Sequence, residues 1–320
     1  MRTRLALAAL LALALPLPPA TAAPDRPAPP AKNAAPANPE SASDGDLAYG
    51  AYQRGFYKAA LVAATERVQR DPKDAAAMTL VGELYNQGLG VRLDPAEAAA
   101  WYRLAAKTGD AHAMASLGLM AIDGRGLAKD PKAGRDWLEK AAALGEPTAA
   151  YNLALILLST GGPTELARAA SLLKVAAEAE IGDAQHDLGV LYSRGEGVAK
   201  SPEEAAKLYL RAAKNGSIAG EVELAIVLFN GDGVPKNEVA AARLFRRAAL
   251  RGNAIAQNRL ARLYATGRGV PRNLTEAAAW HLVAAGKGLP DAWLDGTLKD
   301  LPAADRSRAE QLAVERASAL

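Results

Sequence analysis

The sequence contains no cysteine, which excludes both a disulfide framework and a lipid-anchored lipoprotein. Aromatic residues make up only 5% of the chain. Apolar residues make up 50% and are mostly alanine and leucine, a composition that favours closely packed helices over strands. The formal charge of +3 falls to +1 without Arg2 and Arg4, and no basic block follows them. The charge pattern therefore gives no basis for nucleic-acid binding.

Long apolar runs are also scarce. The run Leu5–Leu15 is too short to span a bilayer as a helix, so stable membrane insertion is not expected. Arginines precede this run and small residues ending at Ala22 follow it, which is the order of a secretory signal peptide over residues 1–22. Residues 23–45 carry hardly any large apolar side chain and are expected to form a disordered Pro/Ala-rich linker. The sequence thus predicts an exported protein, periplasmic or secreted.

Glycines return at a fixed period in the rest of the chain. Pairs separated by one residue recur every 36 residues, or after 71 where one pair is missing: Gly88 and Gly90, Gly124 and Gly126, Gly195 and Gly197, Gly231 and Gly233, Gly267 and Gly269. Single glycines follow in step: Gly109, Gly145, Gly216, Gly252 and Gly288. A period in this range indicates stacked copies of one supersecondary unit.

The unit at 110–145 predicts a pair of helices. Apolar residues from Ala113 onward share one helical face, and Gly124 ends this first helix. Asp130 then caps a second helix that starts at Pro131. On the second helices a large side chain precedes two alanines: Trp101 with Ala105 and Ala106, Trp137 with Ala141 and Ala142, Leu208 with Ala212 and Ala213, Leu244 with Ala248 and Ala249, Trp280 with Ala284 and Ala285. Such alanines allow two helices to approach closely.

The combined pattern of Leu-Gly-x-x-Tyr, Gly-x-Gly-Val, Asp-Pro-x-x-Ala, Trp-Tyr-x-x-Ala-Ala and a closing Gly resembles the Sel1-like repeat, a relative of the tetratricopeptide repeat. The segment from Val81 to Ala106 is nearly a full match. The resemblance implies an all-α fold, a right-handed α-solenoid superhelix of antiparallel helix pairs. It also implies a platform for other proteins, with no catalytic residues and no cofactor.

The units and caps can be placed along the chain. Six repeats are expected within 74–288, at 74–109, 110–145, 146–180, 181–216, 217–252 and 253–288. Residues 46–73 resemble a shortened N-terminal capping repeat, and 289–320 are expected to form C-terminal capping helices that direct Ala309, Leu312 and Val314 toward the last repeat. The third repeat lacks the paired glycines and has Glu180 in place of the closing glycine. This departure indicates either a local change of curvature or ordinary repeat drift.

The sequence gives little evidence for a catalytic site or a metal site. Ser171 and Lys174 have the Ser-x-x-Lys spacing of penicillin-recognising enzymes, but the accompanying Lys-Thr-Gly precedes them and no Ser-Asp-Asn is present. The three histidines, His112, His186 and His281, lie in different units without other ligands at suitable spacing. We therefore expect neither an enzyme nor a metal site, and we expect His281 to occupy an aromatic packing position.

Three positions of each first helix vary in chemistry while the framework stays constant. They are spaced i, i+3 and i+7 and so share one helical face. The first column is Leu80, Ser116, Asn152, Asp187, Glu223 and Arg259. The second is Glu83, Leu119, Leu155, Val190, Ile226 and Arg262, and the third is Gln87, Asp123, Ser159, Arg194, Asn230 and Thr266.

In superhelices of the family that this chain resembles, first helices line the concave side, so the columns predict a groove for a partner helix or peptide. Its expected binding residues are Asp123, Asn152, Asp187, Arg194, Glu223, Asn230, Arg259 and Arg262. The alternative is that the apolar column is core and the polar ones are merely solvated. A basic edge in the loops, made of Lys129, Lys200, Lys236 and Arg272, is either a site for an anionic partner such as cell-wall glycan or a solvated loop surface.

The sequence therefore predicts a non-catalytic, exported scaffold for protein–protein interaction. Among functions known for similar exported proteins, regulation of a membrane sensor kinase or of envelope and polysaccharide assembly in the periplasm is the nearest class. The alternatives are a cell-wall-associated factor that binds peptidoglycan or supports a wall enzyme, and a secreted effector.

Overall fold

The computed structural model describes residues 46–319, so the expected signal peptide and the linker lie outside the described residues. Within this range the chain forms helices and no strand. The helices are α1 (Leu47–Gln53), α2 (Tyr57–Arg70), α3 (Ala75–Gln87), α4 (Pro95–Lys107), α5 (Ala111–Asp123), α6 (Pro131–Ala143), α7 (Pro147–Thr160), α8 (Pro163–Glu178), α9 (Gly182–Arg194), α10 (Pro202–Lys214), α11 (Ile218–Asn230), α12 (Glu238–Leu250), α13 (Ala254–Thr266), α14 (Leu274–Gly286), α15 (Ala292–Leu298) and α16 (Ala303–Ser318).

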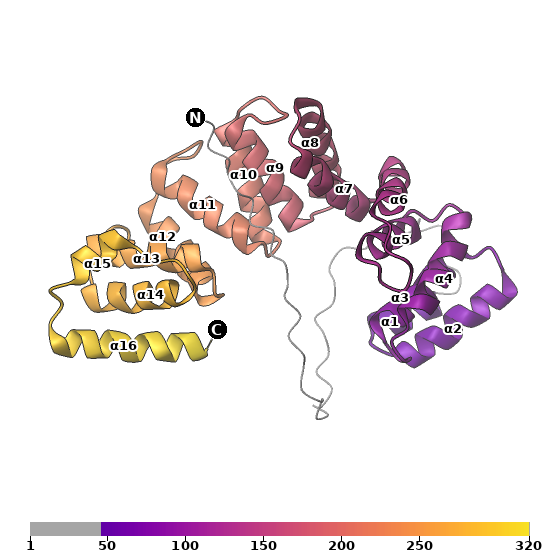
Figure 1. The fold of residues 1–320 in the computed structure, drawn as a ribbon, viewed down its shortest axis with the longest axis horizontal. Coiled ribbons are helices and arrows are strands. Elements are labelled where there is room, and N and C mark those ends of the chain that lie inside the picture. The colour runs from indigo at the N-terminus through magenta and orange to yellow at the C-terminus, as the bar shows by residue number, and fades with distance from the viewer. Residues whose placement is uncertain (1–45, 320) are drawn as a thin grey trace. The chain divides into compact units, whose positions relative to one another are not determined.

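Helices that follow one another in the chain also lie next to one another in space (Figure 1). From α1 to α14 each helix packs against its predecessor and its successor, and first helices of neighbouring units touch as well, as α5 does with α7 and α9 with α11. The extensive contacts within residues 46–319 all join helices at most two places apart. This arrangement is an all-α solenoid, as the glycine period predicts.

The two glycines of each pair have different structural roles. Gly124 ends α5 with a φ of 75°, a left-handed conformation that residues with a side chain disfavour. Gly126 lies against the first turn of α4 in the preceding unit, where a Cβ atom would stand 2.1 Å from the carbonyl oxygen of Pro95. The glycine period therefore marks both a helix end and a contact between units.

The second helices begin as the Asp-Pro pattern predicts. The Asp94 carboxylate accepts hydrogen bonds from the backbone N–H groups of Ala96 and Glu97, at 3.1 and 3.0 Å. Pro95 occupies the first helical position, where its missing N–H removes no hydrogen bond. Side-chain caps also start α6, α10, α12 and α14, whereas α8 follows Gly162 and has none. Each cap fixes the start of its helix and thereby the register of the buried alanines.

In the third repeat Glu180 stands in place of the closing glycine, and the turn after α8 still forms. Glu180 adopts a φ of 61° and is the one non-glycine residue with positive φ between residues 46 and 319. Its carboxylate accepts hydrogen bonds from Gln185 at 2.9 Å and from Arg211 and Asn215 at 2.5 Å each. These bonds join the turn to the next unit and offset the unfavourable backbone conformation.

The closing helices α15 and α16 pack on the last repeat. The sequence predicts the buried face of α16 correctly except at one residue. Ala309 is fully buried and Leu312 is partly buried, as expected. Val314 is 70% exposed, so its predicted inward orientation is wrong. The buried face continues from Ala309 to Ala313, one helical turn on, because α16 lies along α14 with an i, i+4 stripe of small residues.

Candidate protein-binding surface

The three variable columns lie on α3, α5, α7, α9, α11 and α13, and we call the face that they form the first-helix surface. The third column, from Gln87 to Thr266, is exposed along its whole length. In the second column Leu155 exposes 39% of its surface, and Leu119, Val190 and Ile226 are half-buried. The apolar column is therefore partly accessible rather than interior core.

Several of the predicted binding residues already have partners in the described part of the chain. Asp187 accepts a hydrogen bond from the Tyr151 hydroxyl at 3.4 Å and lies 2.8 Å from Nδ1 of His186. Three further residues make local contacts: Asn152 donates to the Thr148 carbonyl, Arg194 lies 3.8 Å from Glu196, and Asn230 donates to Asp232. These contacts hold the side chains in place but leave them at the surface.

Three other predicted residues, Asp123, Glu223 and Arg259, make no side-chain hydrogen bond or ion pair within residues 46–319. Glu223 on α11 and Arg259 on α13 occupy equivalent positions in neighbouring units. The carboxylate of Glu223 and the guanidinium of Arg259 therefore lie unpaired at successive positions of the first column. Both can pair with charged groups of a partner.

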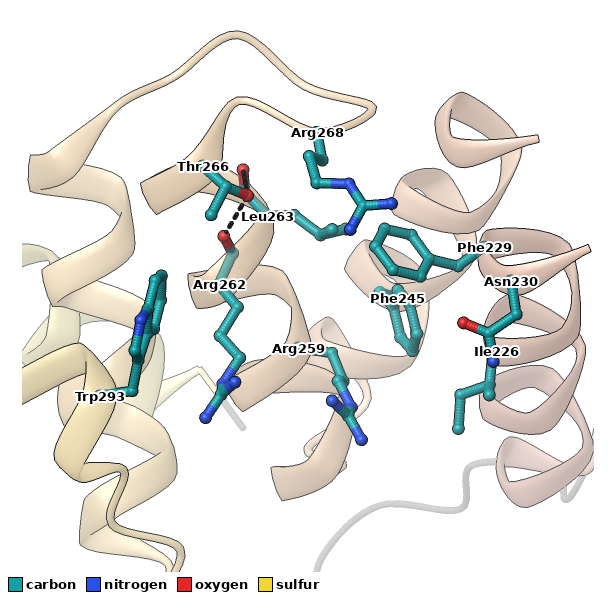
Figure 2. A pocket seen from close by; sticks show the side chains of 10 residues that line it. All are labelled: Ile226, Phe229, Asn230, Phe245, Arg259, Arg262, Leu263, Thr266, Arg268 and Trp293. Atoms are coloured by element: carbon teal, nitrogen blue, oxygen red, sulfur yellow. Dashed lines mark hydrogen bonds between the residues drawn. The ribbon is translucent and has the colours of Figure 1, made fainter. Parts of the chain in front are cut away.

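The first-helix surface deepens into a pocket of about 260 Å³ between α11, α12, α13 and α15 (Figure 2). Of the predicted binding residues, Asn230, Arg259 and Arg262 line it, and the column residues Ile226 and Thr266 lie beside them. The other lining residues are Phe229, Phe245, Leu263, Arg268 and Trp293. Two aromatic rings from the repeats, a third from the closing helix and three arginines thus converge at one place.

Arg268 is fixed at the side of this pocket by an aromatic ring and a carboxylate. Its guanidinium lies 4.0 Å from the centroid of the Phe229 ring and pairs with Glu238 at 2.5 Å. Figure 2 shows the Arg268 side chain beside this ring. Hydrogen bonds from Arg268, and then from Lys236, lower the pKa of Glu238 to about 2. Glu238 therefore stays ionised and keeps Arg268 over the ring.

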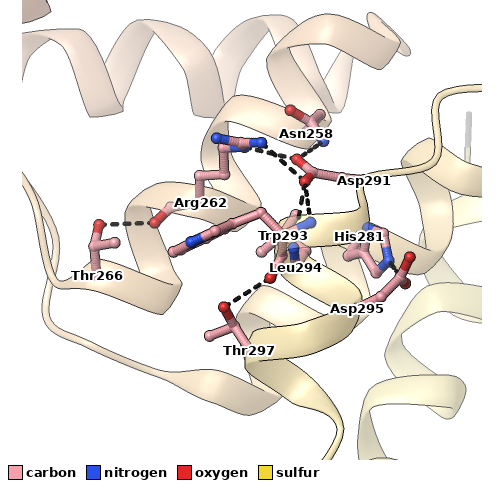
Figure 3. A network of polar contacts seen from close by, with 9 residues as sticks. All are labelled: Asn258, Arg262, Thr266, His281, Asp291, Trp293, Leu294, Asp295 and Thr297. Carbon is pink, nitrogen blue, oxygen red and sulfur yellow. Dashed lines mark hydrogen bonds and ion pairs between the residues drawn. The ribbon is translucent and has the colours of Figure 1, made fainter.

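Arg262 is held in place by the closing helix (Figure 3). The buried Asp291 accepts hydrogen bonds from Arg262 at 2.6 Å and from Asn258 at 2.8 Å, and it caps α15 through the N–H groups of Trp293 and Leu294. These bonds, with that of Arg262 the strongest, hold the pKa of Asp291 well below its usual range. The same guanidinium lies 5.2 Å from the Trp293 ring centroid. Arg262 thus links α13 to the wall of the pocket.

The three columns do not include five residues that line this pocket: Phe229, Phe245, Leu263, Arg268 and Trp293. Trp293 lies beyond the last repeat, so no repeat position predicts it, and Arg268 lies in the loop after α13. Phe229 follows Ile226 by three residues on α11, and that spacing was a usable signal. Phe245 occupies the column of Tyr102, and both Phe245 and Leu263 are buried, so the sequence predicts them as core although they also line the pocket.

The four residues of the basic edge are all exposed, but only two are without partners. Lys236 pairs with Glu238 at 3.0 Å, and Arg272 donates to the Ala265 carbonyl at 3.1 Å. Lys129 and Lys200 make no ion pair in the described range. The Cβ of each of the four residues packs near the glycine that ends the preceding first helix. This packing gives the column a structural role besides its charge.

The histidines and the Ser-x-x-Lys pattern lie apart from the pocket. Each histidine contacts a carboxylate of its own surroundings: His112 with Glu146, His186 with Asp187, and His281 with Asp295. His281 is buried, as expected for its packing column. Over residues 46–319 no group of three or more metal-ligating side chains comes together, and no helix has the length and hydropathy to cross a bilayer.

A family model for the Sel1 repeat matches six segments, at residues 75–110, 111–146, 147–180, 182–217, 218–253 and 254–289. The chain belongs to the Sel1 repeat family. Proteins built from Sel1 repeats generally act as scaffolds for interaction with other proteins, and their fold is typically non-catalytic.

Solved structures of other Sel1 repeat proteins resemble this chain. A Sel1 repeat protein from Oxalobacter formigenes shares 28% identity over 74% of this chain and 96% of its own, with a TM-score of 0.63. A protective antigen present in uropathogenic Escherichia coli strains, which displays an SLR fold, shares 27% identity over 86% of this chain and 68% of its own, with a TM-score of 0.56. No curated protein sequence matches the chain.

Proposed function

We propose that this Sel1 repeat protein is an exported, non-catalytic scaffold that binds a partner protein along its first-helix surface. The observation that carries the proposal is the partly exposed apolar column Leu119, Leu155, Val190 and Ile226, flanked by charged residues on the same face. A helix or an extended peptide bound there would bury these side chains and meet the unpaired Glu223 and Arg259.

The cellular role follows from the expected signal peptide. A scaffold delivered to a bacterial periplasm is suited to regulate a membrane sensor kinase or the assembly of envelope and polysaccharide components. The proposal assigns the binding step to the first-helix surface and no chemical step to the protein.

The experiment compares capture of partners from the native envelope by the parent chain and by charge variants. We expect the pair Glu223→Lys and Arg259→Glu to lower partner yield, because Arg259 is exposed, Glu223 is partly exposed, and neither supports the fold through its own side-chain bonds. The matched control is Glu178→Lys with Arg243→Glu, which reverses two exposed charges on second helices. Equal yields from the parent and the Glu223/Arg259 variant, at equal helicity, would show that partners bind elsewhere.

A second candidate is a cell-wall-associated factor, favoured by the exposed and unpaired Lys129 and Lys200. Such a factor would bind an anionic glycan of the wall or support a wall enzyme. In that case Lys129→Ala with Lys200→Ala would abolish sedimentation with purified peptidoglycan, while the Glu223/Arg259 variant would retain it.

A further inference from the structure

The pocket contains more positive than negative charge, and one of its cations has no partner. Arg262 is held by Asp291, and Arg268 shares Glu238 with Lys236. Arg259 is exposed and pairs with no carboxylate in the described part of the chain. Three arginines and no carboxylate line the pocket, and two of these arginines are bonded to carboxylates outside the lining, so Arg259 remains as an uncompensated positive charge beside the apolar walls.

We propose that this pocket is the anchor site for an acidic peptide segment of the partner. In this site one apolar side chain enters the cavity and a neighbouring Asp or Glu pairs with Arg259. The inference rests on the proposed function and specifies the chemistry of the segment that binds.

The size of the pocket suits a single side chain. Its volume of about 260 Å³ lies below the range of about 300–1,000 Å³ that is usual for cofactor-sized or drug-sized ligands. Its apolar walls come from Ile226, Phe229, Phe245, Leu263 and Trp293. An apolar cavity with aromatic walls is the usual receptor for an interface anchor residue.

The charges of the pocket select an acidic segment. Figure 2 shows Arg259 and Arg262 side by side on α13, with both guanidinium groups extending to the same side of the helix. Because Arg262 is already bonded to Asp291, Arg259 is the group left to receive a carboxylate from outside. A basic segment would instead meet the uncompensated positive charge of Arg259 and be repelled.

The closing helix contributes a binding residue as well as a cap. Trp293 is 44% exposed at the pocket and comes from α15, outside the repeats. Its position depends on Asp291, which caps α15 and is bonded to Arg262 and Asn258 on α13 (Figure 3). Arg262 is therefore a positioning residue, whereas Arg259 and Trp293 contact the bound segment.

The test selects ligands without assuming their sequence. A phage-displayed library of random 12-residue peptides is panned on the immobilised full chain, and an enriched peptide is then synthesised with a fluorescent label. We expect enriched peptides to place Asp or Glu beside a large apolar residue. By fluorescence anisotropy, Arg259→Ala and Trp293→Ala should each raise the Kd of that peptide about tenfold. Arg259→Lys should retain more affinity than Arg259→Ala.

Two matched control variants test whether peptide affinity is lost for nonspecific reasons. Arg243→Ala removes another exposed, unpaired arginine, and Phe56→Ala removes another exposed aromatic ring, 61% accessible at the amino-terminal end of α2. Both should leave the Kd within about twofold of the parent value, since surface changes away from an interface have small effects. Circular dichroism of every variant checks that the helices remain folded.

The remaining outcomes separate this inference from the proposed function. If Leu155→Asp abolishes peptide binding while Arg259→Ala and Trp293→Ala do not, the first-helix surface binds but the pocket is not the anchor site. If none of these three substitutions changes the Kd, both proposals are wrong. Enrichment of basic peptides, or no enrichment over a blank surface, overturns the pocket inference.

Discussion

In two repeats a buried tyrosine of the second helix leaves room only for a glycine opposite it on the first helix. A Cβ atom on Gly82 would lie 2.8 Å from the ring of Tyr102, and one on Gly189 would lie 2.7 Å from the ring of Tyr209. In the third repeat the smaller Leu173 replaces the tyrosine, and Ala154 stands where the glycine would be. Glycine is therefore required opposite these buried tyrosines. Glycine also occurs opposite a leucine, since a Cβ atom on Gly118 would lie 2.9 Å from Leu138, so the tyrosine explains the Leu-Gly pattern only at Gly82 and Gly189.

We expect Gly189→Ala to destabilise the protein by roughly 1 to 3 kcal/mol, because the added methyl group overlaps the Tyr209 ring. Urea denaturation followed by circular dichroism measures the change. Adding Tyr209→Leu should recover part of the loss, since Leu173 and Ala154 already form such a pair. The control Gly296→Ala lies in a helix with no atom within 4 Å of the new Cβ and should be neutral or slightly stabilising. Equal stability of Gly189→Ala and the parent would contradict this packing explanation.

Glu180 gives the third repeat a defined pH dependence. Hydrogen bonds from Gln185, Arg211 and Asn215 lower its pKa from 4.5 to about 2. Because the pKa is lower in the folded state than in the unfolded state, the stabilisation is complete above pH 4.5 and is lost as the pH falls toward 2. Solvent screens this exposed carboxylate, so we expect the effect to stay below about 1 kcal/mol.

The corresponding experiment compares the melting temperatures of the parent and Glu180→Gln from pH 2 to pH 7. The parent should be the more stable protein above pH 4.5, and the two curves should converge near pH 2. A difference that persists unchanged at pH 2 would mean that the carboxylate charge is not its cause.

At the scale of helices, the alanine pairs mark a close approach between helices of neighbouring units. A Cβ atom on Gly220 of α11 would lie only 2.4 Å from the Cβ of Ala212 on α10. Ala248 is the equivalent of Ala212 on α12 and is fully buried. A larger side chain at this position has no space without moving one helix.

Ala248→Leu should therefore cost roughly 1 to 3 kcal/mol in the free energy of unfolding. Lys214→Ala, an exposed position near the end of α10, should change it by no more than about 0.5 kcal/mol. Chemical denaturation of both variants decides the question. If the two have the same midpoint as the parent, the alanine column does not mark the contact between units.

Helix order and repeat length could be predicted because every unit repeats the same caps, glycines and alanines. The face of α16 could not, since the closing helix has no equivalent elsewhere in the chain against which Ala313 and Val314 could be distinguished. The candidate site could likewise be predicted only in part. The columns contain Asn230, Arg259 and Arg262, but the Trp293 wall depends on a tertiary contact made through Asp291.

At the scale of the whole described chain, stability is carried by contacts between adjacent helices. Within residues 46–319 extensive packing joins only helices that are at most two places apart. Stability in such a solenoid is approximately a sum of repeat terms and neighbour terms, and no single core holds every unit. A defect in one repeat should therefore loosen its neighbours before it affects distant repeats.

Leu138 on α6 and Leu260 on α13 test this directly, because both are fully buried and lie in distant repeats. Each leucine-to-alanine substitution should cost about 2 to 5 kcal/mol locally. We expect Leu138→Ala to speed amide hydrogen exchange first in α5 to α7 and to leave α13 to α16 protected, and Leu260→Ala to give the opposite distribution. Hydrogen exchange followed by mass spectrometry reads out both patterns. If each substitution instead lowered protection uniformly from α1 to α16, the chain would unfold as one cooperative unit, and the additive description by neighbouring repeats would be wrong for this protein.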